Sequence, residues 1–543
     1  MQKEILELQK LIKNRNIDKA YEIAKRLSKT DINNKEVIKI LTFLYIQRGQ
    51  FDAAIDRLEK YYNDNPNEKD FDYFINMGVS LKSVEEFQKS LEMYKEAQKI
   101  NPESPLCYTV PAEINLKIRN FDESLRLINI ALDKINKSDA RDSIHFPNAI
   151  KLKTEINVAL QKDEENMEML KSYLREEFHP DIFYLLATVN PSIIDDELLN
   201  LAQKHLQHND DAFQNNLDRF WFVHPLYFAL AIYYEKKDKK KSEDFYHLGN
   251  NETMKSLRYN SFSYQKNISN TMDNYKNTFE NVSLDNDDVG SKNIFILGTP
   301  RSGTTLIESF IASNEDVKSG GELLSASKMI EDYVNREKDF TVDVFINEFR
   351  KKYLSRVSFL RGEFSQIVDK LPENFLYIGQ LLKLLPNARV IRTFRNPWDV
   401  ATSLYKQRYV TNIPYSSSFF NLGVFMSNFE AVNKFWNESI ADKGHLLDVK
   451  YEDLIKDTDF FQKKIYKFLN IKSEYNENKR MGFFAQTASI RQIGSPVHSR
   501  SIEKRDFLDK KDEFYDALLM QRKYWEKRGF KYENNDFFGY KLN

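Results

Sequence analysis

A helical repeat in the first 140 residues constrains the fold of this chain more than any other feature of the sequence. Amphipathic segments open with an aliphatic or aromatic residue at intervals of 34, 36 and 34 residues, and a small residue follows each opening residue by three positions. A small residue at one place in every unit lets two helices approach closely, so the pattern predicts stacked helical hairpins in preference to an irregular bundle. The opening residues are Ile17, Phe51, Phe87 and Phe121, and the small residues are Ala20, Ala54, Ser90 and Ser124.

Proline punctuates the same repeat. Pro66 and Pro102 stand fifteen residues after two of the opening residues, where a proline would end the second helix of a unit. A period of about 34 residues with this punctuation resembles tetratricopeptide repeats. The resemblance implies a helical solenoid over residues 1–150, followed by further helical, degenerate repeats over residues 151–282. In that second stretch, His224-Pro225 and the lysine-rich run 236–241 are expected to interrupt the helices.

Composition excludes several classes of protein. Hydrophobic residues make up 41% of the 543 residues, which is enough for large cores and excludes extended disorder. The 80 Lys and Arg nearly balance the 81 Asp and Glu, so the chain has no overall basic charge with which to hold a nucleic acid. The single cysteine, Cys107, excludes an internal disulfide. Together with a charged N-terminal segment and no long apolar run, it predicts a cytoplasmic protein without a membrane span.

The pattern changes after residues 281–292, a polar, turn-forming stretch that predicts a linker. Beyond it, short apolar runs alternate with amphipathic segments, as is typical of a parallel sheet covered by helices. The sequence therefore predicts a three-layer α/β domain over residues 290–543. The expected strands are 293–297, 367–368, 388–393 and 445–449, and the expected helices lie near 304–313, 373–385, 397–409 and 451–469.

The first expected strand runs directly into a glycine-rich loop, Gly298-Thr299-Pro300-Arg301-Ser302-Gly303. A strand, a Gly-x4-Gly loop and a helix form a cradle for phosphate, because backbone N–H groups and the helix N-terminus both face the anion. A nucleoside triphosphatase would need lysine after the second glycine, where this chain has Thr304. The cation of the loop is instead Arg301, so the loop suits a phosphate that carries a further anionic group.

The segment Pro300–Leu306 resembles the 5′-phosphosulfate loop of sulfotransferases that use 3′-phosphoadenosine-5′-phosphosulfate (PAPS). The whole chain is similar to tetratricopeptide-repeat sulfotransferases, and its second half resembles the protein-tyrosine sulfotransferases. In the family an arginine at a strand end and a serine eight residues later clamp the 3′-phosphate of the donor, and Arg395 and Ser403 match that pair. The resemblance implies PAPS as the donor, no metal, and a set of donor-binding residues: Arg301, Ser302, Gly303, Thr304, Thr305, Arg395, Ser403, Tyr451, Gln492 and Lys504. A core aromatic that opens a helix is the competing interpretation of Tyr451.

Sulfuryl transfer to a hydroxyl needs a base for the incoming proton and cations for the charge that develops. Glu322 follows two glycines, and the resemblance implies that it is the general base; a solvated loop carboxylate is the alternative. Lys370 is expected at the carboxyl end of a parallel strand, where ligands bind, and the resemblance makes it a stabiliser of the transition state. Arg301 and Ser489 complete the implied catalytic set.

The chain departs from the family pattern in two places. Asn314-Glu315 stands after the first helix, where the family often has His-Pro. Gln407 lies four residues after Ser403, where the family has a cation. Lys406 or Arg408 is therefore expected to supply positive charge to the 3′-phosphate.

The sequence favours a sulfotransferase that acts by in-line transfer and whose repeats recruit a hydroxyl-bearing acceptor or a second subunit, such as a second copy of the chain. The acceptor stays open, because a protein tyrosine, a glycan and a small alcohol or phenol all present the same group. A scaffold whose degenerate phosphate loop senses nucleotide is the second hypothesis, but a scaffold would have no reason to retain Glu322, Lys370 and Arg395 together. A kinase is disfavoured by the missing lysine of the phosphate loop.

Overall fold

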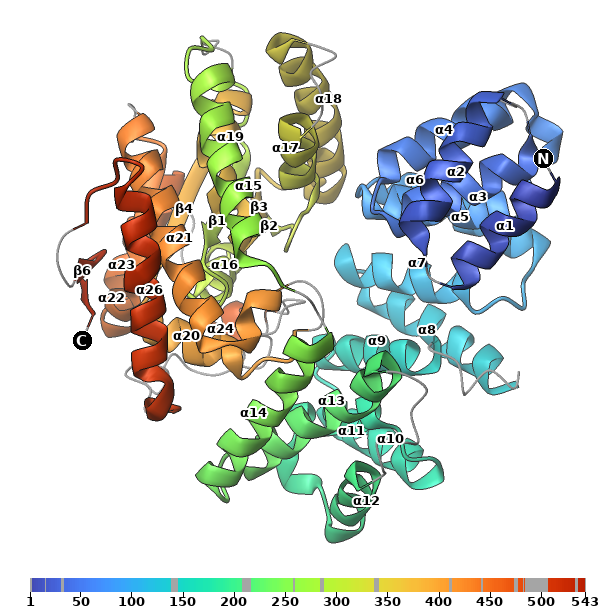
Figure 1. Cartoon of the computed structure of the whole chain (residues 1–543), viewed down its shortest axis with the longest axis horizontal. Coiled ribbons are helices and arrows are strands. Elements are labelled where there is room, and N and C mark those ends of the chain that lie inside the picture. Colours follow the sequence, from blue (N-terminus) through green and yellow to red (C-terminus); the bar gives the residue numbers. More distant parts are fainter. Residues whose placement is uncertain are drawn as a thin grey trace. The chain divides into compact units, whose positions relative to one another are not determined.

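The structure is a computed structural model of the full chain, which divides into two compact units, Met1–Ile156 and Asn157–Asn543 (Figure 1). Every helix within the described ranges is too short or too polar to cross a membrane. The structure describes residues 2–14, 16–30, 34–137, 145–207, 216–256, 259–283, 288–335, 341–409, 413–440, 443–472, 477–481, 483, 506–532 and 536–542.

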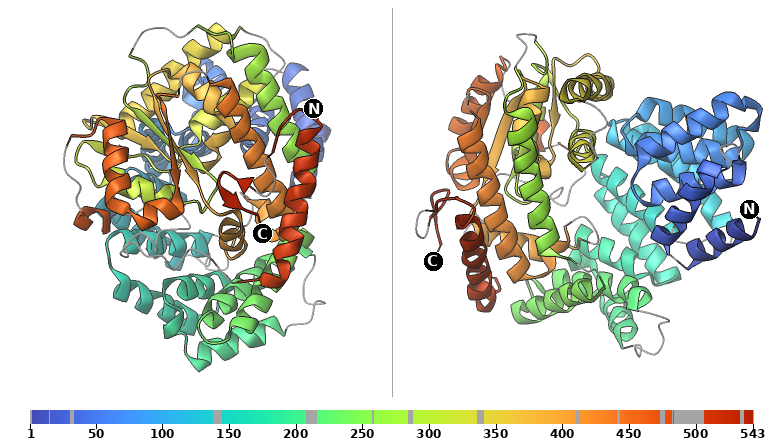
Figure 2. Two further views of the ribbon diagram at one scale, coloured as in Figure 1. Left: turned by 90° about the vertical axis from the view of Figure 1, so that its left-hand side faces the viewer. Right: turned by 45° about the horizontal axis from the view of Figure 1, so that its top comes forward.

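The first unit is a stack of helical hairpins in which each helix up to residue 137 packs on the next along the chain (Figure 2). The four predicted opening residues are each the first residue of the second helix of a hairpin. The helices are α1 (Gln2–Lys13), α2 (Ile17–Thr30), α3 (Lys35–Gln47), α4 (Phe51–Asp64), η1 (Pro66–Glu68), α5 (Phe71–Ser83), α6 (Phe87–Ile100), α7 (Leu106–Lys117), α8 (Phe121–Lys137) and α9 (His145–Ala159).

The predicted small residues lie where the two helices of each hairpin meet, and all four are fully buried. Ser90 Oγ donates to the Gly78 carbonyl at 2.7 Å, and Ser124 Oγ donates to the Ala112 carbonyl at 2.6 Å. A hydroxyl that bonds the backbone of the facing helix requires close contact between the helices, which a longer side chain would prevent. The predicted tetratricopeptide-like solenoid is therefore confirmed.

The second unit opens with further helices, and one of their hairpins repeats the serine contact of the first unit, since Ser242 Oγ donates to the Ala231 carbonyl at 2.8 Å. The interruption predicted at His224-Pro225 is wrong, because Pro225 lies inside a helix of 19 residues. Its neighbours His224, Leu226 and Phe228 are buried, and the packing of these side chains outweighs the roughly 3 kcal/mol that an interior proline costs. The helices are α10 (Asp163–Glu176), α11 (Pro180–Val189), η2 (Pro191–Ile193), α12 (Asp196–Leu206), α13 (Asn216–Tyr234), α14 (Lys239–Ser256), α15 (Ser261–Asn274) and η4 (Tyr275–Phe279).

A five-stranded parallel sheet follows, with the strand order β2-β3-β1-β4-β5. Its strands are β1 (Asn293–Gly298), β2 (Val317–Ser319), β3 (Gln366–Asp369), β4 (Arg389–Phe394) and β5 (Leu446–Lys450). The helices between and after the strands are α16 (Thr304–Ala312), α17 (Ser325–Asn335), α18 (Val342–Arg361), η5 (Pro372–Tyr377), α19 (Ile378–Leu384), α20 (Pro397–Tyr405), η6 (Pro414–Ser417), α21 (Phe419–Ser439), α22 (Tyr451–Lys456), α23 (Thr458–Leu469), α24 (Glu477–Met481), η8 (Leu508–Lys510) and α26 (Lys511–Glu526), and a short hairpin, β6 (Asp536–Phe537) and β7 (Tyr540–Lys541), ends the described chain.

Helices cover both faces of this sheet, as the alternation of patterns predicts. Side chains of β1 alternate between the faces: Ile294 and Ile296 join a core with α16 and α23, while the Phe295 ring stacks on Tyr353 of α18 at 6.1 Å. All six residues of β1 are buried, which identifies it as the central strand of a three-layer α/β structure. The fold class predicted for the second half is thus confirmed.

The compact unit that contains the sheet begins at Asn157, so the predicted linker 281–292 lies inside it. Side chains on both sides of that stretch bond to one another. His247 Nδ1 lies 2.7 Å from the Tyr405 hydroxyl, and Asn250 Nδ2 donates to the Tyr405 carbonyl at 2.9 Å. Gln380 of α19 donates to the Thr271 carbonyl of α15. Helices α14 and α15 are therefore structural parts of the sheet unit.

We expect a fragment that starts at Asn157 to fold, and a fragment that starts at Ser283 to aggregate or to unfold without a cooperative transition. The shorter fragment loses α14 and α15 and exposes the buried Tyr405 and Gln380. Size-exclusion chromatography and thermal unfolding followed by circular dichroism compare the two. A monomeric, cooperatively unfolding fragment from Ser283 would contradict this division.

Candidate active site

Three adjacent strands bring most of the predicted site residues together at the carboxyl ends of the strands. Since β1 lies between β3 and β4, the phosphate loop after β1 is flanked by Lys370 after β3 and by Arg395 after β4. Glu322 follows β2, the edge strand beside β3. Ligands of open parallel sheets bind at the carboxyl ends of the strands, at the point where the strand order reverses. Here that point is β1, because β2 and β3 lie on one side of it and β4 and β5 on the other.

The backbone of the phosphate loop takes a conformation that side chains rarely adopt. Arg301 has a φ of 69° and Gly303 a φ of 98°, both in the left-handed region. A Cβ on Gly303 would come within 2.5 Å of the Tyr451 ring, so only glycine fits there. Ser302 Oγ lies 2.6 Å from the Thr299 carbonyl and 2.5 Å from Thr393 Oγ1 on β4. The Ser302 hydroxyl thus ties the loop to β4, while Thr304 and Thr305 form the first turn of α16.

Two arginines are buried side by side at this loop. Arg301 Nε donates to Ser403 Oγ at 2.9 Å, and Arg395 Nη1 donates to the Arg301 carbonyl at 2.8 Å. The Arg395 guanidinium lies over the Tyr451 ring, 4.3 Å from its centroid, so Tyr451 lies beside both Gly303 of the loop and Arg395. Burial, aided by the like charge of Arg395, lowers the pKa of Arg301. Two neighbouring buried guanidinium groups suit an anionic ligand, and the residues present therefore fit a ligand that carries phosphate groups.

A buried lysine joins two carboxylates on the other side of the loop. Lys370 Nζ donates to Glu322 Oε1 at 2.5 Å and lies 3.9 Å from Glu308 Oε2. The Lys370 side chain is 0% exposed, whereas Glu322 is 40% exposed. Gly320 lets the backbone after β2 approach β3 closely, since a Cβ there would come within 2.8 Å of the Val368 carbonyl. The arrangement places a fixed cation and a partly accessible carboxylate next to the phosphate loop.

The structure also changes one expectation about the cations near Ser403. Lys406 bonds Glu235 at 3.3 Å and Asp506 at 3.0 Å, so its charge is matched by carboxylates away from the loop. Arg408 pairs with Asp181 at 2.8 Å and donates from Nε to His224 Nδ1 at 3.2 Å. Neither side chain therefore replaces the cation that the family has at the position of Gln407. Both side chains instead bond the segment after α20 to the helices before the sheet.

Some predicted residues lie outside the part of the chain that the structure describes. These are Ser489, Gln492 and Lys504, together with Pro496 of the same segment. No group of three or more potential metal ligands occurs within the described ranges.

Three neighbouring residues were missed by the sequence analysis. Glu308 is a charged residue in the apolar segment Leu306–Phe310, a signal that could have marked it. Glu373, three residues after Lys370, and Tyr409 carry no such local signal. Burial raises the pKa of Glu373 to about 7, and the nearby Glu322 adds to the rise. Burial also raises the pKa of the Tyr409 hydroxyl, on which the charges of Arg301, Glu322 and Glu373 act.

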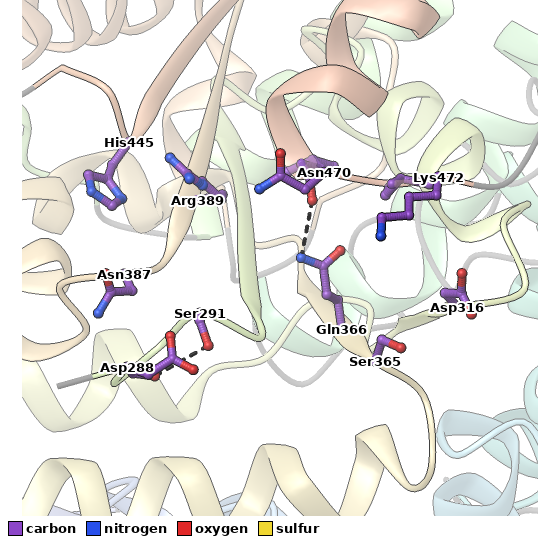
Figure 3. Close-up of a pocket in the computed structure, with 12 residues that line it drawn as sticks. Asp288, Ser291, Asp316, Ser365, Gln366, Asn387, Arg389, His445, Asn470 and Lys472 are labelled. Carbon is purple, nitrogen blue, oxygen red and sulfur yellow. Dashed lines mark hydrogen bonds between the residues drawn. The ribbon is translucent and has the colours of Figure 1, made fainter.

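A cavity of about 490 Å³ lies at the amino ends of the strands, opposite to the candidate active site. Gln366 and Arg389, the first residues of β3 and β4, line it, as does His445 before β5 (Figure 3). Gln366 Nε2 donates to the Leu469 carbonyl and Arg389 Nη1 to the Gly444 carbonyl. Because it contains none of the residues predicted from the sequence, this cavity is separate from the candidate active site.

Comparison with known proteins finds relatives of the region that contains the candidate active site. Residues 293–475 match the sulfotransferase family. An uncharacterized protein of Aquifex aeolicus (strain VF5) is 32% identical over 233 residues, which are 39% of this chain and 30% of that protein. A putative protein-tyrosine sulfotransferase of Caenorhabditis briggsae is 26% identical over 194 residues, 33% of this chain and 65% of that protein. The chain thus spans less than two thirds of either relative.

Among solved structures, sulfotransferase STF1 from Mycobacterium tuberculosis H37Rv aligns with 60% of this chain and 98% of its own, at 15% identity and a TM-score of 0.26. The family match covers β1 to β5, the phosphate loop, Glu322, Lys370, Arg395 and Ser403. Residues 293–475 thus carry both the match to the sulfotransferase family and most of the candidate active site.

Proposed function

We propose that this protein transfers the sulfuryl group of PAPS to a hydroxyl-bearing acceptor, and that its helical repeats recruit that acceptor or a second subunit. The match to the sulfotransferase family supports the reaction class. The observation that carries the proposal is the meeting, at one sheet edge, of a phosphate loop, two buried arginines and the Lys370–Glu322 pair. The phosphate loop has Thr304 where a kinase would have a lysine, which disfavours a kinase, and an accessible carboxylate beside a buried lysine favours catalysis over nucleotide sensing.

Each residue of the site would have a separate task. The loop amides and Arg301 hold the 5′ end of the donor, while Arg395 and Ser403 hold its 3′-phosphate through charge-assisted hydrogen bonds. When bound, PAPS would supply the activated sulfuryl group and the bisphosphate that leaves. Glu322 takes the proton from the acceptor hydroxyl, which makes the oxygen a better nucleophile. Lys370 holds the Glu322 carboxylate in place and offers positive charge where negative charge develops.

The direct test is transfer of ³⁵S-labelled sulfate from PAPS to a panel of peptides, glycans and phenols. Thermal shifts separate the alternatives, because adenosine 3′,5′-bisphosphate should stabilise a sulfotransferase without magnesium. Stabilisation by ATP with magnesium, and not by the bisphosphate, would indicate a kinase. Bisphosphate binding without transfer to any member of the panel would favour the nucleotide-sensing scaffold.

Replacement of Arg395 by alanine should weaken donor binding. The variant removes a buried guanidinium from the proposed phosphate clamp, and loss of one partner of such a pair costs about 2–5 kcal/mol of binding free energy. Isothermal titration calorimetry with adenosine 3′,5′-bisphosphate measures the effect. Arg389→Ala, at the other end of the same strand, is the matched control and should leave the dissociation constant unchanged. Equal affinities of Arg395→Ala and the unaltered protein would remove Arg395 from the donor site.

A further inference from the structure

Arg395 stands between a strand and a helix, so its direction depends on the two peptide groups beside it. Phe394, the last residue of β4, is held in the sheet by its pairing with Lys450 of β5. Asn396 is the residue that caps the N-terminus of α20, and its own N–H points away from that helix. The residues that fix this second peptide group therefore matter for Arg395. The inference rests on the proposed function, in which Arg395 holds the 3′-phosphate of the donor.

Glu452 of α22 fixes the peptide group that follows Arg395. The Asn396 N–H donates to Glu452 Oε1 at 2.9 Å. In a capping box this N–H bonds a carboxylate three residues later in the same helix, whereas Glu452 is 56 positions away along the chain. Glu452 directly follows Tyr451, whose ring lies 4.3 Å from the Arg395 guanidinium. The first two residues of α22 thus contact both the side chain of Arg395 and the peptide group beside it.

The other oxygen of Glu452 bonds a tyrosine of the β6–β7 hairpin. The Tyr540 hydroxyl lies 2.5 Å from Glu452 Oε2 and 3.3 Å from the Phe394 carbonyl oxygen. Because the hydroxyl has a single proton, the shorter contact is the bond that it donates. The Phe538 ring packs on the Phe394 ring, with 4.7 Å between their centroids. The hairpin therefore contacts the residue before Arg395 and, through Glu452, holds the residue after it.

A buried ion pair attaches the hairpin to two long helices. Arg522 of α26 donates from Nε and Nη2 to the two oxygens of Glu430 on α21, both at 2.8 Å, and from Nη2 to the Asp536 carbonyl of β6. The Arg522 and Glu430 side chains are 5% and 1% exposed. At the turn of the hairpin, the Gly539 N–H donates to Asp536 Oδ1 at 3.0 Å. A bidentate pair has one geometry, so β6, which lies beside α22 in Figure 1, starts from a fixed point.

We propose that Glu452 and Tyr540 are positioning residues of the donor site. They act through the Asn396 N–H and set the direction in which Arg395 meets the 3′-phosphate. A guanidinium makes two parallel bonds to a phosphate only when it is held to within about 0.5 Å of the correct geometry. The contacts that run from Arg522 through the hairpin and Glu452 to Asn396 supply this restraint on the backbone.

The experiment measures the preference of the full-length protein for a 3′-phosphate. This preference is the ratio of the dissociation constant of adenosine 5′-monophosphate to that of adenosine 3′,5′-bisphosphate, both from isothermal titration calorimetry. The two ligands differ only in the group that Arg395 would hold. Tyr540→Phe removes the hydroxyl and keeps the ring, and it should lower the ratio about threefold to tenfold by weakening bisphosphate binding alone.

Tyr524→Phe is the matched control, because it makes the same change on α26, where the hydroxyl accepts a hydrogen bond from Arg528 at the surface. The control should keep the ratio of the unaltered protein. A variant that is merely less stable has fewer binding sites for both ligands, so its ratio is also unchanged. The ratio therefore separates positioning of Arg395 from a general role in stability.

A double variant tests whether Tyr540 acts through Glu452. Glu452→Ala should lower the ratio at least as much as Tyr540→Phe does, because the Asn396 N–H loses its acceptor. Adding Tyr540→Phe to Glu452→Ala should then have no further effect, since two residues of one chain of contacts are not additive. Independent effects that multiply would overturn this route to Arg395.

Hydrogen exchange of the unaltered protein tests the proposal without any substitution. Coupling between two sites is reciprocal, so the bisphosphate should slow exchange of the β6–β7 amides, including the Gly539 N–H, more than the monophosphate does at equal saturation. Equal exchange with both ligands, or an unchanged ratio in a folded Tyr540→Phe variant, would overturn the assignment and leave the sulfotransferase proposal intact. Failure of the unaltered protein to bind the bisphosphate would instead contradict the proposed function.

Discussion

Replacing Glu322 by glutamine should reduce kcat by about 10²–10⁴-fold, because the variant keeps the shape of the side chain and removes the group that accepts the proton. Donor affinity should stay within about threefold, since Glu322 bonds Lys370 and not the arginines of the donor site. The loss should be largest for a weakly acidic alcohol and smallest for an acidic phenol such as a nitrophenol, which gives up its proton with little help. Turnover across phenols of graded acidity measures this dependence.

The matched control for this experiment is Glu315→Gln. Glu315 follows α16 and pairs with Lys479 at the surface, with 79% of its side chain exposed, so the variant should leave turnover unchanged. If the ratio of unaltered to Glu322→Gln rates is the same for every acceptor while donor binding is intact, Glu322 has a structural role and another group removes the proton.

Replacing Lys370 by methionine should damage both stability and turnover. Methionine fills a similar volume but leaves the Glu308 carboxylate, 1% exposed, without its buried cation. Removing one partner of a buried ion pair typically costs about 3–5 kcal/mol of unfolding free energy. Loss of a cation beside the developing charge should lower kcat by about 10²–10³-fold as well. Chemical denaturation and steady-state kinetics measure the two effects.

The double variant Lys370→Met with Glu308→Gln distinguishes the two roles of the lysine. Glutamine at position 308 removes the negative charge that Lys370 faces and can still accept the hydrogen bond from Ser319 Oγ, which is 2.7 Å long in this structure. The double variant should therefore regain most of the lost stability and none of the lost turnover. Recovery of turnover together with stability would mean that Lys370 acts only by holding the fold.

The parts of the site that follow from local sequence were predictable. The phosphate loop needs a strand, two glycines at fixed spacing and a helix, and all of these are contiguous in the chain. Arg395 and Ser403 lie eight residues apart across one strand end and one helix, and the structure brings both to Arg301. The expected strands coincide with β1, β3, β4 and β5, because buried parallel strands are short apolar runs.

The parts that depend on distant residues were not predictable in this way. Glu308 and Lys370 are 62 positions apart along the chain, and only the sheet order that sets β3 beside β1 makes them partners. Arg408 looked available for a phosphate until the packing of α11 and α13 supplied Asp181 and His224 as its partners. Burial lowers the pKa of His224 well below its usual value, and the Arg408 charge adds to this, so the neutral ring accepts the bond from Arg408.

The sequence by itself determined four of the five strands of the sheet, where the repeat places its small residues, and which loop can hold a phosphate. These properties depend on periodicity and on backbone conformations that a few neighbouring residues decide. Only the tertiary structure decided that helix α13 runs through Pro225, that α14 and α15 belong with the sheet, and that Lys370 lies between Glu322 and Glu308. The physical reason is that burial and charge pairing act between residues far apart in the chain, and their energies exceed the local preferences that a sequence displays.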